Sequence, residues 1–144
     1  MLPLLGRDDP APFVVHREHG GSPFVLIADH AGQAVPAALQ GLGIARAELD
    51  RHIGWDIGIA GTTRALAGLL DAWMIEQVYS RLVIDCNRPL RSPTLIPALS
   101  DGTAIPANAC ISEAARKARV EAIHARPTTP ASAPNWRPAP PPAA

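Results

Sequence analysis

Hydrophobic residues in this chain fall into short continuous runs and one helical repeat, a pattern typical of an α/β domain. Residues 24–28 are apolar throughout and are followed by Asp29, His30 and then Gly32. A short apolar run that ends near a glycine predicts a buried parallel strand. Residues 72–78 are also largely apolar and predict the next strand.

Between these two runs the apolar residues recur at helical spacing. Over residues 55–70 they include Ile59, Leu66 and Leu69, which predicts the longest helix of the chain. Strand, helix and strand with short connections predict a right-handed βαβ unit and therefore a parallel sheet. Further helices are expected at 36–39, 45–52 and 113–123, the last with Ser112 as its N-cap.

Proline and glycine divide the chain into three parts. Residues 1–23 are a Pro/Gly-rich lead-in with a short extended piece near Phe13, and residues 24–125 form the domain. Residues 126–144 hold seven of the 16 prolines, so this tail cannot form a helix or a central strand. Its composition predicts a disordered, polyproline-like segment.

Composition excludes several classes of protein. With 13 basic and 13 acidic residues the net charge is zero, so neither nucleic acid nor an anionic membrane is an expected partner. No apolar stretch approaches the roughly 20 residues of a membrane span, and the N-terminus lacks the features of a signal peptide. Cys86 and Cys110 form no metal-like or disulfide pattern, so a cytoplasmic location is expected.

Candidate chemistry begins where the first predicted strand ends. A neutral His30 imidazole at the carboxyl edge of a sheet could bind zinc, or it could simply satisfy backbone groups in a turn. His52 and Asp56 are four residues apart and share a face if the segment is helical, which is a common zinc-ligand spacing. Asp56 could equally cap the helix that follows it.

The densest group of polar residues follows the second predicted strand. If this strand continues through residues 81–87, alternation places Arg81, Asp85 and Asn87 on one face. Arg81 and Arg88 could then hold a carboxylate through paired hydrogen bonds, with Asn87 donating to a carbonyl oxygen. The alternative is an Arg–Asp ion pair that ties the loop to the sheet.

The segments 28–32 (ADHAG), 52–58 (HIGWDIG) and 79–89 (YSRLVIDCNRP) together resemble the N-formylglutamate amidohydrolase family of zinc-dependent hydrolases. The resemblance extends from about Ser22 to His124. It implies an incomplete three-layer α/β sandwich with a mainly parallel sheet, the N-terminal part of a carboxypeptidase-like zinc hydrolase fold. It also implies hydrolysis of an amide in a small N-formyl or N-acyl glutamate-type substrate by zinc-activated water.

The resemblance further assigns roles to individual residues. The zinc ligands would be His30, Asp56 and His52, and the catalytic carboxylates Asp56 and Asp85. The substrate-binding residues would be Arg81, Asn87, Arg88, Ser100 and Asp101. Gln33 departs from the His-x-x-Glu pattern of more distant relatives, so that motif is not carried over. The third metal-binding histidine and the general acid/base are expected downstream, in sequence that this chain does not contain.

The resemblance implies that Pro-Tyr-His and then a helix follow His124 and Ala125. The Pro-rich tail departs from this expectation. Codons for residues 126–137 can be chosen so that the frame one base earlier encodes such a segment. We therefore expect a frameshifted and truncated product with weak or no hydrolysis. If the tail is natural instead, the competing interpretation is a non-catalytic carboxylate- or partner-binding module whose Pro-rich tail docks in aromatic grooves.

Overall fold

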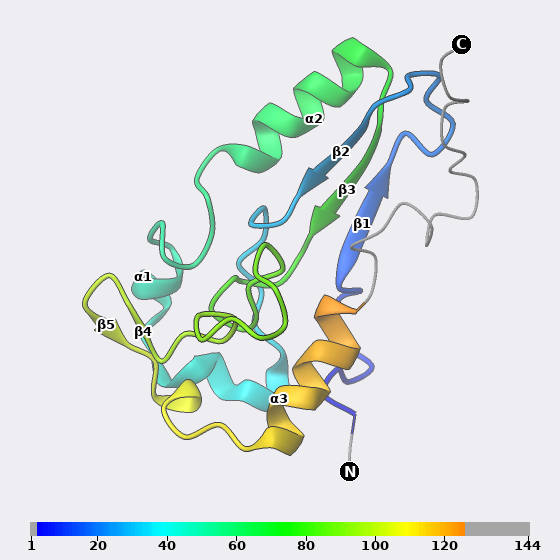
Figure 1. The fold of residues 1–144 in the computed structure, drawn as a ribbon. Coiled ribbons are helices and arrows are strands. Elements are labelled where there is room, and N and C mark those ends of the chain that lie inside the picture. Colours follow the sequence, from blue (N-terminus) through cyan, green and yellow to red (C-terminus); the bar gives the residue numbers. More distant parts are fainter. Residues whose placement is uncertain (1–2, 126–144) are drawn as a thin grey trace.

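The computed structural model describes residues 3–125 (Figure 1). Its elements, in chain order, are β1 (Phe13–His16), β2 (Val25–Ala28), η1 (Ala37–Gly43), α1 (Arg46–Leu49), α2 (Ile59–Leu70), β3 (Trp73–Gln77), β4 (Leu99–Ser100), β5 (Thr103–Ala104), η2 (Pro106–Asn108), α3 (Glu113–Arg119) and η3 (Val120–His124). The predicted Pro-rich tail at 126–144 lies outside the described residues. Within the described part, no helix is both long and apolar enough to cross a lipid bilayer.

The predicted βαβ unit is present as β2, α2 and β3. β2 and β3 run parallel, from the pair Val25 and Trp73 to the pair Ala28 and Glu76. α2 packs against both strands and covers one face of the sheet (Figure 1). The helix begins at Ile59, later than predicted, because Gly58 adopts a left-handed conformation (φ 88°) that a right-handed helix cannot contain.

The sheet is mixed, whereas a mainly parallel sheet was expected. Its strand order is β1-β3-β2, and β1 pairs antiparallel with β3. β1 comes from the lead-in, so this segment contributes to the sheet. The second helical layer of the expected three-layer sandwich is not found within residues 3–125. On the sheet face away from α2, Trp73 and Ile75 instead pack with Phe13, Val15 and Val25.

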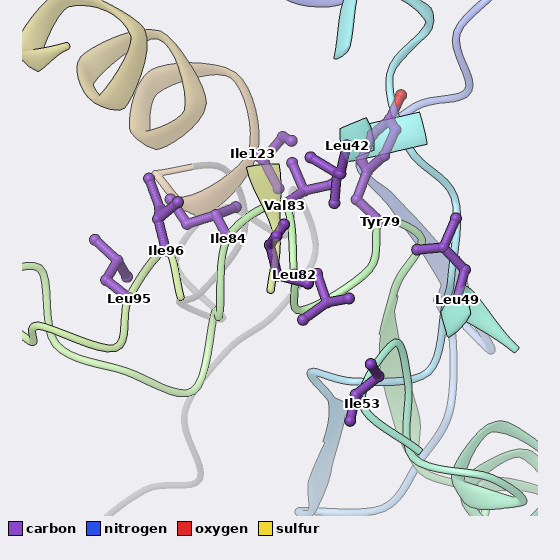
Figure 2. Packing of buried hydrophobic residues seen from close by; sticks show 11 residues of the cluster. Leu42, Leu49, Ile53, Tyr79, Leu82, Val83, Ile84, Leu95, Ile96 and Ile123 are labelled. Carbon is purple, nitrogen blue, oxygen red and sulfur yellow. The ribbon is translucent and has the colours of Figure 1, made fainter. Parts of the chain in front are cut away.

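The largest hydrophobic core lies beyond the sheet, among loops and short helices (Figure 2). Its centre is the segment that follows β3, where Tyr79, Leu82, Val83 and Ile84 are all almost fully buried. Side chains from distant parts of the chain surround them: Leu42, Leu49, Ile53, Leu95, Ile96, Ile105 and Ile123. This core therefore fixes the position of the polar residues that flank it.

The prediction that the strand continues through residues 81–87 is wrong, because this segment forms consecutive turns. The Ser80 hydroxyl accepts a hydrogen bond from the Leu82 backbone amide at 3.1 Å, and the Ser80 carbonyl accepts one from Val83 at 2.9 Å. Such local bonds offer the backbone an alternative to a strand ladder. Leu82, Val83 and Ile84 are consequently all buried, and the expected alternation of faces is absent.

Two local features at the C-terminal side follow from the chemistry of one or two residues, and the second confirms the predicted Ser112 cap. Asp101 and Gly102 have φ values of 44° and 76° and form the tight turn between β4 and β5, as an Asp-Gly pair predicts. The Ser112 side chain accepts a hydrogen bond from the Ala115 amide at 3.2 Å and so caps α3.

Candidate functional site

The loops that follow β2 and β3 meet at the carboxyl ends of these two parallel strands. Ala34 donates to the Val78 carbonyl at 3.1 Å and accepts from the Ser80 amide at 2.8 Å. Gly32 makes this approach possible, because a Cβ at that position would lie 1.9 Å from the Val78 oxygen. The Asp56 amide also donates to the His30 carbonyl at 2.9 Å, which brings a third segment to the same edge.

His30 is the centre of the polar cluster formed by these segments. Its Nε2 lies 2.7 Å from an Asp85 carboxylate oxygen, and its Nδ1 lies 3.1 Å from an Asp56 carboxylate oxygen. His30 and Asp85 are only 7% and 4% exposed, whereas the Asp56 side chain is about half exposed. The imidazole therefore connects a buried carboxylate to one that solvent reaches.

Two arginines lie against the same carboxylates. Arg81 donates through Nη1 to Asp56 at 3.1 Å and through Nη2 to Asp85 at 3.2 Å. The exposed Arg88 approaches Asp85 with an Nε–Oδ2 distance of 3.7 Å. Arg81 therefore forms the ion pair that was the alternative to substrate binding. We call His30, Asp56, Arg81 and Asp85 the His30 cluster.

The contacts of the His30 cluster shift its ionisation. The hydrogen bond to Asp85, and more weakly its charge and the bond to Asp56, raises the pKa of His30 above the ordinary 6.5. Burial by itself raises the pKa of Asp85, but the hydrogen bond and charge of His30 and the charge of Arg81 outweigh it and hold that pKa below 3.8. Burial raises the pKa of the neighbouring Asp29.

We expect a matching pH dependence of stability in the metal-free protein. Because folding raises the His30 pKa, its stabilising contribution is complete below pH 6.5 and is lost as the pH rises through the folded value. The difference in unfolding free energy between wild type and His30→Asn should therefore shrink above pH 6.5. Urea unfolding across this range, with a chelator present, measures it. A difference that grows with pH would contradict the assignment.

Buried side chains hold the turns that carry Arg81 and Asp85. Asn108 donates to the Leu82 carbonyl at 2.9 Å, and Arg119 donates to the Val83 carbonyl at 2.9 Å. Because these carbonyls belong to no strand, they have no partner strand to bond to, and the Asn108 and Arg119 side chains supply their hydrogen bonds instead. Sequence reasoning missed the role of Arg119, since an arginine near the end of an amphipathic helix ordinarily indicates a solvent-facing position.

Three predicted site residues lie apart from the His30 cluster. His52 is exposed and lies 3.5 Å from Asp101. It shares no helical face with Asp56, because residues 50–57 form turns. Asp101 also pairs with Arg51, and Ser100 lies beside it in β4. Within residues 3–125, no ion pair or hydrogen bond connects His52, Ser100 or Asp101 to the cluster.

The remaining predicted residues lie at the rim of the cluster. Asn87 is exposed, and its backbone amide donates to Asp85 at 3.0 Å. Arg88 is similarly exposed, and its carbonyl lies 3.0 Å from His124 Nε2. Both residues are therefore near the cluster and accessible from outside.

The donor set of the cluster fits part of a zinc site. A histidine that ligates zinc commonly donates its other ring N–H to a carboxylate, as His30 Nε2 is placed to do with Asp85. His30 Nδ1 and Asp56 would then face the metal together. A catalytic zinc usually takes three protein ligands, and no group of three suitable side chains is arranged to hold a metal within the described residues.

Comparison with known proteins places the chain in a family. The crystal structure of gene product Atu2144 from Agrobacterium tumefaciens is similar, with a TM-score of 0.81 and 31% sequence identity. The match covers 84% of this chain and 48% of that one, so this chain spans about half the length of the solved protein. A comparison with curated proteins found no match. A model of the N-formylglutamate amidohydrolase family matches residues 22–126. The chain therefore belongs to the N-formylglutamate amidohydrolase family.

Proposed function

We propose that this chain carries part of the active site of a zinc-dependent amidohydrolase that cleaves N-formyl or N-acyl glutamate-type amides. The observation that carries the proposal is the His30 cluster at the carboxyl edge of the parallel strands β2 and β3. Ligands and catalytic groups of α/β enzymes gather at this edge. The family match over residues 22–126 supports the reaction class.

In this proposal Asp85 positions His30 rather than touching the substrate. Its carboxylate holds the proton of Nε2, which leaves Nδ1 and Asp56 as the pair that would bind zinc. When bound, zinc supplies a Lewis acid that polarises the amide carbonyl and activates water. The third ligand and the general acid/base come from outside residues 3–125. The isolated chain should therefore hydrolyse weakly or not at all.

Arg88 is the better placed arginine for recognising a substrate carboxylate. Both Nη atoms of Arg81 already donate to Asp56 and Asp85. The Arg88 side chain is 49% exposed, and within residues 3–125 its only polar contact is the long 3.7 Å approach to Asp85. Its guanidinium can therefore turn toward an incoming carboxylate with little loss of existing bonding.

Binding of N-formyl-L-glutamate in the presence of zinc tests this assignment. Arg88→Met should weaken binding about tenfold, the effect of losing a charge-assisted hydrogen bond. Arg91→Met is the matched control, because it removes an exposed arginine from the same loop and should leave the affinity unchanged. Calorimetry measures both.

Three outcomes would contradict parts of the proposal. Equal affinity in both variants would remove Arg88 from the substrate site. Formate release by the isolated chain at about 1 s⁻¹ or more, the range of ordinary enzymes, would show that residues 3–125 need no further ligands. Glutamate binding that is independent of zinc would instead favour the carboxylate-binding module.

The cytoplasmic location expected from Cys86 and Cys110, both free thiols, stays a prediction.

A further inference from the structure

Arg119 is an unusual buried cation outside the His30 cluster. Its side chain is among the largest that are fully buried, with 2% of the residue exposed. Nη1 donates to the Val83 carbonyl at 2.9 Å and to the Asn108 side-chain oxygen at 2.7 Å. One end of the guanidinium is therefore firmly held by neutral acceptors.

The other edge of the guanidinium has no partner within residues 3–125. Nε is buried without a hydrogen bond, and Nη2 makes none in the described part of the chain. Nε–H and Nη2–H lie side by side and point the same way, which is one of the arrangements that binds two carboxylate oxygens at once. Burial lowers the pKa of Arg119 to about 10, so the group remains cationic at neutral pH, and no ion pair joins it to a carboxylate within residues 3–125.

Arg119 also lines a pocket of about 440 Å³ between η1, η2 and α3. The walls of the pocket are mainly small or apolar and include Leu39, Ile111 and Ala115. A buried charge without a counter-charge is costly. An anion that entered this pocket would relieve that cost, and an aliphatic stem would pack on the walls.

We propose that this pocket binds a small aliphatic carboxylate, which is attracted by the Arg119 guanidinium and reaches its unpaired Nε and Nη2 edge once the side chains that cover Nε move aside. The ligand class follows from one buried cation and apolar walls: one negative charge and a short hydrocarbon chain. None of the residues of the His30 cluster lines the pocket. The pocket is therefore separate from the His30 cluster, although Arg119 also holds the Val83 carbonyl, and hexanoate binding to the wild-type chain can fail without failure of the proposed hydrolysis.

Cys110 provides a local readout, because its exposed thiol lines the same pocket. The other cysteine, Cys86, is partly buried, and burial raises its pKa to about 11, so it reacts slowly near neutral pH. The experiment measures the rate at which iodoacetamide alkylates Cys110 in the full chain, with sodium hexanoate, with neutral hexanamide, or with sodium chloride at the same ionic strength.

Hexanoate at ten times its Kd should slow alkylation of Cys110 roughly tenfold, because it occupies about nine-tenths of the sites. Hexanamide and chloride should give little protection. Arg119→Met should abolish the protection by hexanoate. Lys117→Met, which removes an exposed cation of the same helix, should retain it. Equal protection by hexanamide, or protection that survives in Arg119→Met, would overturn the proposal.

A second variant covers the case in which Arg119→Met fails to fold. Ala115 is exposed and lines the pocket, so Ala115→Leu narrows the pocket without disturbing the core. In this variant the ratio of alkylation rates with and without hexanoate should approach one. A wild-type protein that hexanoate does not protect, or an unchanged ratio in Ala115→Leu, would refute the site.

Discussion

The Asp85→Asn substitution is expected to lower the pKa of His30 toward its ordinary value and to destabilise the fold by about 3 kcal/mol. Asp85 is buried and accepts from His30, Arg81 and the Asn87 amide. Asparagine preserves the shape but removes the charge. The hydrogen bond to Asp85 is the largest cause of the raised His30 pKa, so its loss should be visible directly in the titration of the imidazole.

NMR titration of His30 and urea unfolding measure the two effects of Asp85→Asn. Asp50→Asn is the matched control, because Asp50 forms an exposed ion pair with Arg46 and exposed pairs contribute little. It should change neither quantity appreciably. If the pKa of His30 were the same in wild type and Asp85→Asn, the 2.7 Å contact would not govern its ionisation.

The second large effect is expected for Gly32→Ala, which should cost about 3 kcal/mol by overpacking. An added Cβ would lie 1.9 Å from the Val78 carbonyl oxygen, which is backbone and cannot rotate away. The bridge between Ala34 and Tyr79 would have to open. His30, two residues earlier, would move with it, so the pKa of His30 should also fall.

Gly68→Ala is the control for this substitution. Gly68 lies in α2, and a Cβ there would meet no atom within 4 Å apart from the backbone of its own helix. Alanine in a helix is favoured over glycine by up to about 1 kcal/mol, so this variant should be slightly more stable than wild type. Thermal unfolding distinguishes the two variants, because the melting temperature should fall in Gly32→Ala and rise slightly in Gly68→Ala. A stable Gly32→Ala protein with a normal His30 titration would show that the two loops do not need this close approach.

The sequence predicted those parts of the fold that depend on local pattern. Apolar runs located β2 and β3 to within one residue at each end, and the helical repeat located α2. The Asp101–Gly102 turn and the Ser112 cap depend on the chemistry of one or two residues, which makes them predictable. The antiparallel pairing of β1 was not predictable, because direction is set by a partner about 60 residues away.

The path of residues 81–85 shows why the rest of the site could not be predicted. Alternation suggests a strand there, but tertiary contacts override it: the Ser80 hydroxyl bonds to the backbone, and Asn108 and Arg119 hold the Leu82 and Val83 carbonyls. Arg81 and Asp85 still meet, four residues apart on a turn. The spacing of His52 and Asp56 was misleading, because residues four apart share a face only in a helix, and the segment between them forms turns instead.

The proposed function depends most on zinc binding at the His30 cluster. The most direct test is zinc titration of the purified chain, followed through the ring nitrogens of its five histidines by long-range ¹H–¹⁵N NMR. Zinc is expected to shift His30 first, at Nδ1, and Asp56→Asn is expected to weaken this response. A first response at His52, or a His30 ring that zinc leaves unchanged, would contradict it.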